Sequence, residues 1–326
     1  MRSSFKEVIL KSTLAQGIGQ LDPIQELWSG YGKIIRVNLL GASVPSVVAK
    51  NIILPKSAHH PRGWDTNASH QRKIKSYEIE LEWYKRYSQQ CDKKCRVPNF
   101  VSSEIDEEEQ LIVLEDLNVI GFSLQKVELN KYEVKQCLEW LANFHGTFLN
   151  VKPEGLWDVG TYWHLSTRQD EFNVMKEGVL KENAFRIDEL LSACKYKTFV
   201  HGDAKVANFC FSIRGNNVAA VDFQYVGGGC GMKDVAYFLG SCLNESQCSK
   251  WEVELLESYF NSLRVKLESE SANVNFDELE EEWRKLYPVA WTDFSRFLYG
   301  WVPAHQKLNA YSKEMEDETL ALLFRH

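Results

Sequence analysis

One segment constrains the fold more than any other, because it places polar side chains inside an otherwise apolar stretch: residues 199–224, FVHGDAKVANFCFSIRGNNVAAVDFQ. A turn at residues 214–217 separates two short runs that are typical of strands, which predicts a hairpin. Such a hairpin brings Asn208 close to Asp222, and the amide and carboxylate oxygens of these side chains are ligands that Mg²⁺ prefers. The segment therefore predicts a metal site at a strand end.

Two further side chains of this segment predict a reaction. Asp203 would lie beside the metal without binding it, where a carboxylate can orient or deprotonate an attacking hydroxyl. Lys205 would neutralise charge on a phosphoryl group during its transfer. The alternative is a polar β-hairpin in which Asp and Asn only satisfy turns.

Composition favours a globular protein with a small-molecule partner. The 326 residues are 44% hydrophobic and 25% charged, with a formal net charge of -7, so we expect no general attraction for nucleic acid or an anionic membrane. The first residues hold no apolar run long enough for a secretion signal, and we expect a cytoplasmic protein. Cys91 and Cys95 have metal-like spacing, but no second pair follows them, which disfavours zinc.

The order of elements predicts an α+β protein with two lobes. In the first third, residues 33–41, 46–54, 96–105 and 110–117 have the pattern of strands around one helix at 69–90. After residue 117 the pattern is mainly helical, with a strong amphipathic helix at 131–149 and a sheet-like island at 198–222. We therefore expect a β-rich lobe over 1–117, a helical lobe over 118–326 and a hinge near 113–121.

The polar segment resembles a known catalytic loop. HGDAKVAN, residues 201–208, followed by VDFQ, residues 221–224, is similar to the catalytic loop and metal-binding Asp of the protein-kinase-like fold. The form is that of the aminoglycoside phosphotransferase and choline kinase superfamily. It is closest to the ecdysteroid-kinase-like (CHK kinase-like) branch, which has Gly where protein kinases have Arg, DFQ in place of DFG, and a later Asp before an apolar helix, as in KDVAYFLG.

The resemblance implies a small nucleotide-binding N-terminal lobe, a larger catalytic and acceptor-binding lobe, and an ATP- and Mg²⁺-dependent kinase that phosphorylates a hydroxyl of a small molecule. It implies the following roles: Asp203 and Lys205 are catalytic, Asn208 and Asp222 bind the metal, and His201 and Asp234 support the loop. His145 resembles a family position with a packing role. A nucleotide-binding module of the pseudokinase type, without turnover, is the alternative.

Two side chains of the first lobe resemble the pair that holds nucleotide phosphates. Lys50 lies in an apolar strand, where it resembles the strand lysine of kinases; an edge lysine that discourages aggregation is the alternative. Of Glu78, Glu80 and Glu82 on the following helix, Glu80 precedes an aromatic-Tyr pair as in the family pattern. We therefore expect Glu80 to pair with Lys50, against the alternative of a solvated helix face.

The remaining nucleotide contacts are expected from backbone groups. Gly30 and Gly32 would let amides approach the phosphates, with Ser29 and Tyr31 at the tip of the turn. A plain hairpin turn is the alternative. The segment VLEDL resembles the hinge, where backbone groups of Glu115 and Leu117 would bind adenine.

The acceptor side is predicted from an aromatic segment near the C-terminus. Trp291, Asp293 and Trp301 are candidates for an acceptor pocket, and Trp291 with Asp293 would favour a cationic acceptor. A core helix is the alternative. The glycine-rich stretch 227–231 has the composition of a mobile segment after Asp222.

Overall fold

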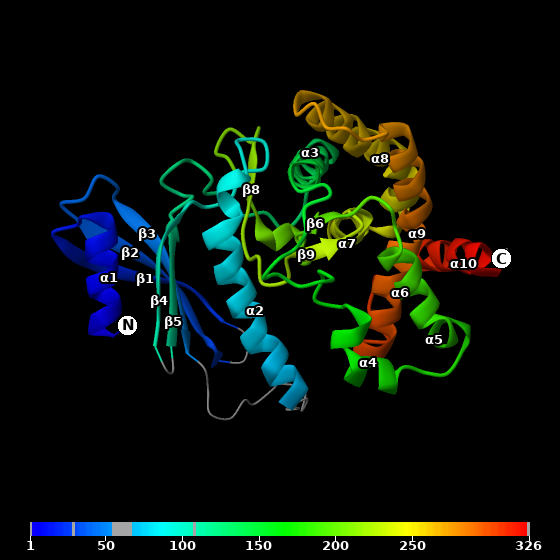
Figure 1. Ribbon diagram of the computed structural model, residues 1–326, viewed down its shortest axis with the longest axis horizontal. Helices are drawn as coiled ribbons and strands as arrows, with labels where there is room; N and C mark the ends of the chain where they lie inside the picture. The colour runs from blue at the N-terminus through cyan, green and yellow to red at the C-terminus, as the bar shows by residue number, and fades with distance from the viewer. Residues whose placement is uncertain (1, 28–29, 54–66, 107–108, 325–326) are drawn as a thin grey trace.

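The structure is a computed structural model that describes residues 2–27, 30–53, 67–106 and 109–324. Its larger sheet lies in the first third of the chain, and most of its helices follow (Figure 1). The expected α+β architecture, with a small β-rich lobe and a larger helical one, is confirmed.

Five antiparallel strands form the sheet of the first lobe, in the order β1-β2-β3-β5-β4. Their bounds are β1 Gly17–Glu26, β2 Gly32–Leu40, β3 Ser46–Ile53, β4 Phe100–Ile105 and β5 Glu109–Glu115. Strand β3 is central, and its Lys50 lies opposite Ile34 of β2 and Ile112 of β5. Lys50 is therefore not an edge residue, which excludes that alternative.

The two faces of the sheet pack against different helices, because successive side chains of a strand point to opposite sides. Helix α1 (Ser3–Thr13) covers one face in a cluster of Phe5, Ile9, Ile35, Val37, Leu39, Val47, Ala49, Leu111 and Val113. Ile52, Ile112 and Leu114 belong to the main core with residues of helix α2 (Asn67–Arg86). Lys50 shares a face with Ile52, two residues later, and so points toward α2.

The N-terminal segment corrects the sequence analysis, which expected only one helix in the first lobe. Helix α1 buries only Phe5 and Ile9, and two apolar positions are too few to mark a helical face in a sequence. Strand β1 contains Gly17, Gly19 and Pro23, and most of its side chains are exposed. An exposed edge strand with such residues lacks the usual strand signal.

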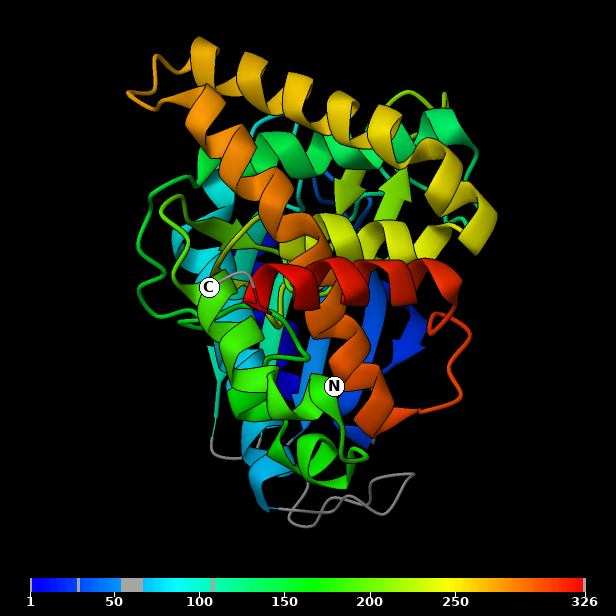
Figure 2. The same cartoon turned by 90° about the vertical axis from the view of Figure 1, so that its right-hand side faces the viewer.

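The second lobe consists mainly of helices. They are α3 Lys131–Thr147, α4 Gln169–Val174, α5 Val179–Glu182, α6 Ala184–Ser192, α7 Met232–Cys242, α8 Glu245–Ser269, α9 Phe276–Trp301 and α10 Ala310–Phe324. Helix α3 begins at a capping box, in which Asn130 and Glu133 each accept the amide proton of the other. Helix α8 packs along α3, and α9 packs against α7 and α10 (Figure 2).

The structure also contains two small antiparallel sheets of two strands each, both formed by residues of the second lobe. Strand β6 (Thr198–Val200) pairs with β9 (Gly227–Gly229), and β7 (Phe209–Phe211) pairs with β8 (Val218–Ala220). The glycine-rich stretch, predicted to be mobile, thus contains a paired strand. Its glycines allow close packing, because a Cβ atom at Gly227 would lie 2.2 Å from the carbonyl oxygen of Trp157.

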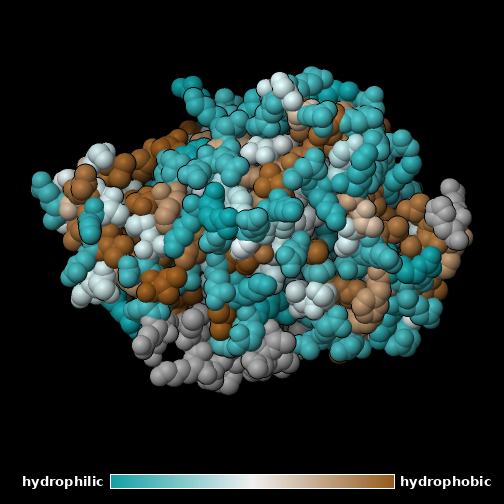
Figure 3. Space-filling view, viewed as in Figure 1, coloured by the Kyte–Doolittle hydropathy of each residue, from teal (hydrophilic) through white to brown (hydrophobic). Residues whose placement is uncertain are grey.

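The surface in the view of Figure 3 is largely hydrophilic, with hydrophobic atoms in separate patches. Among the helices within the described ranges, none carries an apolar stretch that would reach across a lipid bilayer.

Candidate active site

The catalytic-loop segment begins where β6 ends. Asp203 is buried, and its carboxylate accepts three hydrogen bonds: from Tyr237 Oη to Oδ1 at 3.0 Å, and from Lys205 Nζ and Asn208 Nδ2 to Oδ2 at 2.8 and 3.2 Å. The loop turns at Gly202, whose φ is +78° and where a Cβ atom would lie 2.1 Å from the Tyr225 carbonyl oxygen. Only glycine fits there, which fixes the direction of Asp203.

The backbone places Asn208 next to the residue that precedes Asp222. The Asn208 carbonyl accepts the Val221 amide at 3.0 Å, which brings the end of β8 next to the start of β7. Asn208 Nδ2 donates to both the carbonyl and the carboxylate of Asp203. This use of the amide nitrogen directs the Asn208 amide oxygen away from Asp203, as a metal ligand requires.

The charges around Asp222 suit a magnesium ligand. Burial would raise the pKa of Asp222, but Lys50, Lys73 and Lys205 outweigh it and lower this pKa to about 2. The carboxylate is therefore ionised at neutral pH. No group of three or more His, Cys, Asp or Glu side chains in the described ranges has metal-binding geometry. Asn208 and Asp222 each carry a side-chain oxygen of the kind that can hold Mg²⁺ together with substrate phosphates and water.

Asp234, at the start of α7, anchors the catalytic-loop segment through hydrogen bonds to its backbone. Its carboxylate accepts the backbone amides of His201 and of Gly202, the latter at 2.9 Å. His201 Nε2 contacts the Val221 carbonyl at 3.0 Å, and its Nδ1 accepts the Asp203 amide, so the ring joins the loop to the end of β8. His145 contacts Asp234 at 3.2 Å from within the core.

Lys50 and Glu80 form a buried ion pair. Lys50 Nζ lies 2.6 Å from Glu80 Oε2 and 3.3 Å from Asp222 Oδ1, and both residues of the pair are less than 5% exposed. Burial would lower the pKa of Lys50, but the two carboxylates raise it, so the ammonium stays charged. Of the other two candidates, Glu82 pairs with Arg86 on the helix surface and Glu78 lines a different cavity.

The glycine turn before β2 differs in part from the expectation. Gly30 has φ +77° and an open position for a Cβ atom, whereas a Cβ atom at Gly32 would lie 2.0 Å from the Asn51 carbonyl oxygen. The Tyr31 ring is buried against Tyr77, so its side chain does not extend from a tip of the turn. Ser29 lies outside the described residues.

The hinge is braced by a residue that was not predicted. Asp116 is buried and accepts hydrogen bonds from Arg36 Nε at 2.6 Å and Ser46 Oγ at 2.7 Å, which joins β2 and β3 to the hinge. The Glu115 amide donates to Asn99, and the Leu117 carbonyl accepts from Phe122. These two backbone groups, one from each residue predicted to bind adenine, are thus engaged within the protein.

Two of the three predicted acceptor residues lie in the protein core. Trp291 is 5% exposed, and its Nε1 donates to Ser312 Oγ at 2.9 Å. Asp293 is fully buried and accepts hydrogen bonds from Arg296 at 2.8 Å and Trp163 Nε1 at 3.0 Å. Its charge is balanced inside the lobe, which corrects the expectation that Asp293 and Trp291 form a pocket for a cation.

Trp301 belongs to a different cluster, next to Asp203. The members of this cluster are Tyr162, Trp163, Tyr237, Phe294, Phe297, Leu298, Trp301 and Leu308. Trp301 is half-buried and stacks on Phe297, and the ammonium of Lys307 lies 5.3 Å from the Tyr237 ring centre. Because Tyr237 donates a hydrogen bond to Asp203, this aromatic cluster adjoins the catalytic-loop segment.

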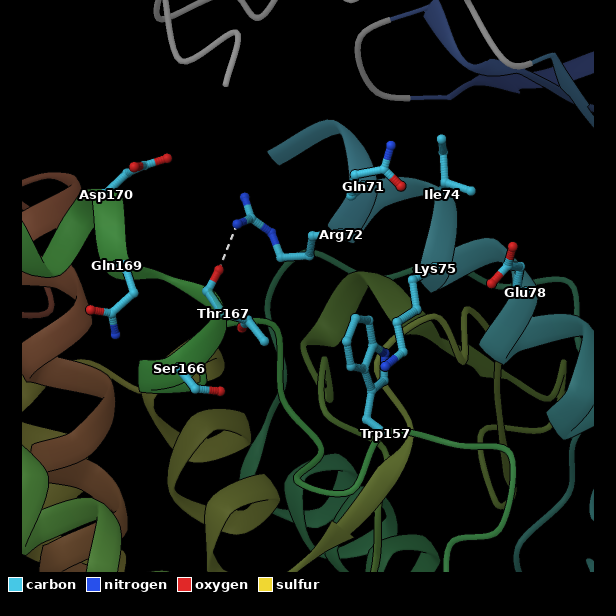
Figure 4. A pocket seen from close by; sticks show the side chains of 10 residues that line it. All are labelled: Gln71, Arg72, Ile74, Lys75, Glu78, Trp157, Ser166, Thr167, Gln169 and Asp170. Atoms are coloured by element: carbon cyan, nitrogen blue, oxygen red, sulfur yellow. Dashed lines mark hydrogen bonds between the residues drawn. The ribbon is translucent and has the colours of Figure 1, made fainter. Parts of the chain in front are cut away.

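A cavity of about 440 Å³ separates α2 from residues 157–170 of the second lobe. Figure 4 shows Arg72 and Lys75 reaching across from α2. Arg72 Nη1 donates to the Thr167 carbonyl at 2.6 Å, and Lys75 Nζ lies 4.6 Å from the Trp157 ring centre. Helix α2 is therefore attached to the second lobe as well as to the sheet.

Two family models match parts of the chain. The ecdysteroid kinase-like family matches residues 46–157, and a family described as "Uncharacterized oxidoreductase dhs-27" matches residues 164–320. A comparison with curated protein sequences gave no match. The first of these matches confirms the resemblance to the ecdysteroid kinase-like branch.

Solved structures extend the comparison over the whole chain. "Amicoumacin kinase hAmiN in complex with AMP-PNP, Ca2+ and Ami" is 15% identical, with a TM-score of 0.57 over 98% of this chain and 97% of that one. A microcompartment-associated aminopropanol kinase is 13% identical, with a TM-score of 0.51 over 96% and 98%. At this identity the likeness shows the fold. The chain therefore has the overall fold of these two small-molecule kinases, and the expected two-lobed kinase-like fold is confirmed.

Proposed function

We propose that this protein is an ATP- and Mg²⁺-dependent kinase that transfers the γ-phosphoryl group of ATP to a hydroxyl of a small metabolite. The observation that supports this most is the convergence of Lys50, Glu80, Asp203, Asn208 and Asp222 from both lobes. In this proposal, residues 1–117 form the nucleotide-binding lobe and residues 118–326 form the catalytic and acceptor-binding lobe.

The chemistry follows from the hydrogen bonds of the site. A hydroxyl oxygen of the acceptor forms a bond to the γ-phosphorus while the bond from that phosphorus to the β-γ bridging oxygen breaks, which releases ADP. Asp203 orients the hydroxyl and accepts its proton. Lys205 faces the transferred group and offsets its charge. When bound between Asn208 and Asp222, Mg²⁺ would supply positive charge to the phosphate oxygens.

The nucleotide is held by groups of the first lobe. Lys50 binds α- and β-phosphate oxygens, and Glu80 holds the Lys50 ammonium in place. The backbone around Gly30 and Gly32 covers the phosphates, and the hinge at Glu115 to Leu117 lies beside the base. Adenine would bind backbone groups of this segment other than the Glu115 amide and the Leu117 carbonyl, which are engaged within the protein.

The acceptor is proposed to lie against the aromatic cluster rather than the middle of α9. Tyr237 joins this cluster to Asp203, and Trp301 lies at its half-buried side. Lys307 and Arg168 already lie over aromatic rings there. Because four rings of the cluster already have a cation over one face, the cluster has less capacity to attract a cationic acceptor.

Two other functions fit the observations less well. A nucleotide-binding module without turnover would need a missing chemical group, yet each position of the catalytic loop carries the expected side chain. The oxidoreductase description belongs to the family that matches residues 164–320. In the described part of that segment the named strands are three residues long and pair antiparallel, unlike the parallel sheet that binds a dinucleotide.

Mg²⁺-dependent ATP turnover tests the proposal. We expect the wild-type protein to hydrolyse ATP slowly in the presence of Mg²⁺ and without acceptor, because water can replace the acceptor hydroxyl. Asp222→Ala should abolish this turnover and weaken the binding of the metal-nucleotide complex. If the wild-type protein binds nucleotide but shows no turnover with any member of a broad acceptor panel, the module is the better account.

A further inference from the structure

Gln224 forms a buried bridge between the segment of Asp222 and helix α2. Its side-chain Nε2 donates to Asp222 Oδ1 at 2.6 Å, and its Oε1 accepts from Lys73 Nζ at 2.6 Å. The Ser76 hydroxyl also lies 3.2 Å from this Oε1 atom. Gln224 itself is only 5% exposed, whereas the Asp222 carboxylate that it contacts is partly open to solvent.

The contact with Lys73 fixes the orientation of the Gln224 amide. A lysine ammonium can only donate hydrogen bonds, so the atom that it contacts must be the amide oxygen. The amide nitrogen then points to Asp222 and donates to it. Lys50 donates to the same carboxylate oxygen, Oδ1, at 3.3 Å. Two donors on one oxygen restrict the rotation of the Asp222 carboxylate.

The same bridge connects Asp222 to the Lys50–Glu80 pair by a second route. Lys73 and Glu80 are seven residues apart, which is close to two turns of α2, so both lie on one face of the helix. The contacts therefore close a ring that runs from Lys50 to Glu80, along α2 to Lys73, through Gln224 to Asp222, and back to Lys50. A change in the position of α2 would therefore alter both of its contacts in this ring, that of Glu80 with Lys50 and that of Lys73 with Gln224.

We propose that Gln224 is a positioning residue, which sets the orientation of the Asp222 carboxylate for Mg²⁺ and ties it to helix α2. This inference rests on the proposed function, because it assigns Asp222 to the metal. Hydrogen bonds that orient metal ligands commonly contribute a factor of 10 to 100 to metal affinity. Gln224 would act through Asp222 without touching the metal or the acceptor.

The test measures binding at equilibrium. A non-hydrolysable ATP analogue is titrated at increasing Mg²⁺ concentration into the wild-type protein, Gln224→Met and Gln224→Asn. Methionine keeps the length of the side chain without its hydrogen bonds, and asparagine is one methylene too short to span both partners. We expect the Mg²⁺ concentration for half-maximal binding to rise about tenfold or more in both variants. Binding of the analogue without Mg²⁺ should change less than twofold.

Arg72→Met is the matched control. Arg72 also ties α2 to the second lobe, through the Thr167 carbonyl, but none of its hydrogen bonds reaches Asp222. The variant Arg72→Met should lower the melting temperature and leave the Mg²⁺ concentration required for binding unchanged. If Gln224→Met and Gln224→Asn bind with the wild-type Mg²⁺ requirement, or if Arg72→Met shifts it equally, the proposal for Gln224 is wrong. If the wild-type protein itself shows no Mg²⁺-dependent binding, the proposed function fails instead.

Discussion

Tyr237 donates its hydroxyl to Oδ1 of Asp203 at 3.0 Å, while Lys205 and Asn208 contact the other carboxylate oxygen. The proposed base is therefore oriented by an aromatic side chain of α7 that also belongs to the cluster beside it. This contact joins the proposed chemistry to the proposed acceptor wall.

Tyr237→Phe should lower the rate of Mg²⁺-dependent ATP turnover and leave nucleotide affinity unchanged. A hydrogen bond to a charged group contributes about 1.5 to 3 kcal/mol, so the loss should be about tenfold or more if it is expressed in the turnover step. Steady-state kinetics on the variant gives the number. Tyr287→Phe, which removes a buried hydroxyl that contacts Tyr311, is the control and should keep the wild-type rate. Equal losses in both variants would argue against a role for Tyr237 at Asp203.

Glu80→Gln should raise KM for ATP, because the amide cannot balance the charge of Lys50 and the ammonium is then drawn toward Asp222. We expect a change of at least tenfold, since breaking a buried pair leaves an uncompensated charge that costs about 3 to 5 kcal/mol. Part of that cost will appear as a lower melting temperature. The surface substitution Glu82→Gln should alter neither quantity. An unchanged KM in Glu80→Gln would contradict the assignment of Lys50 to the phosphates.

The two tryptophans of α9 should behave differently. Trp291→Ala should lower the free energy of unfolding by about 3 to 5 kcal/mol, because it leaves a cavity in the main core. Trp301→Ala should cost less stability, because its ring is only half-buried, and it should raise KM for the acceptor while sparing KM for ATP. Chemical denaturation and acceptor kinetics separate the two effects. A selective rise of acceptor KM in Trp291→Ala would restore that residue to the pocket.

Lys307 should make stability depend on pH in the alkaline range. The pKa of Lys307 is lowered from the ordinary 10.5 to about 8, mainly by burial. The nearby Lys205 also lowers this pKa, whereas Cys242 and Asp203 raise it. Between these pH values the unfolded chain binds more protons than the folded one, so stability rises with pH. Lys307→Met should therefore be more stable than the wild-type protein at pH 7, and the difference should shrink toward pH 10. A difference that is constant over this range in denaturation experiments would refute the prediction.

The sequence predicts the parts of the site that lie close together along the chain or follow a regular period. Asp203, Asn208 and Asp222 belong to one hairpin segment, and the alternation of β3 directs Lys50 to α2. Period and spacing do not reveal which side chain covers another. The sequence therefore fits Trp291 to a pocket as well as to a core, and it does not show that Tyr31, expected at the tip of the glycine turn, packs against Tyr77.

Contacts between residues far apart along the chain could not be predicted, because period and spacing do not show which elements pack together. Gln224 and Lys73 are 151 positions apart, and Asp203 and Tyr237 are 34 apart. Each contact depends on how α2 and α7 pack against the catalytic loop. The local signal for Gln224 is its place in the motif DFQ, residues 222–224, where protein kinases have DFG.

Transfer of label from ATP tests the central claim most directly. The protein is incubated with Mg²⁺, γ-labelled ATP and a panel of small hydroxyl compounds, and labelled products are separated from phosphate. We predict a labelled phosphate ester with the wild-type protein. Asp203→Asn should form it about 100 to 10,000 times more slowly while binding nucleotide with nearly unchanged affinity. Transfer by Asp203→Asn at the wild-type rate, or ATP binding by the wild-type protein with label remaining in ATP throughout, would contradict the account.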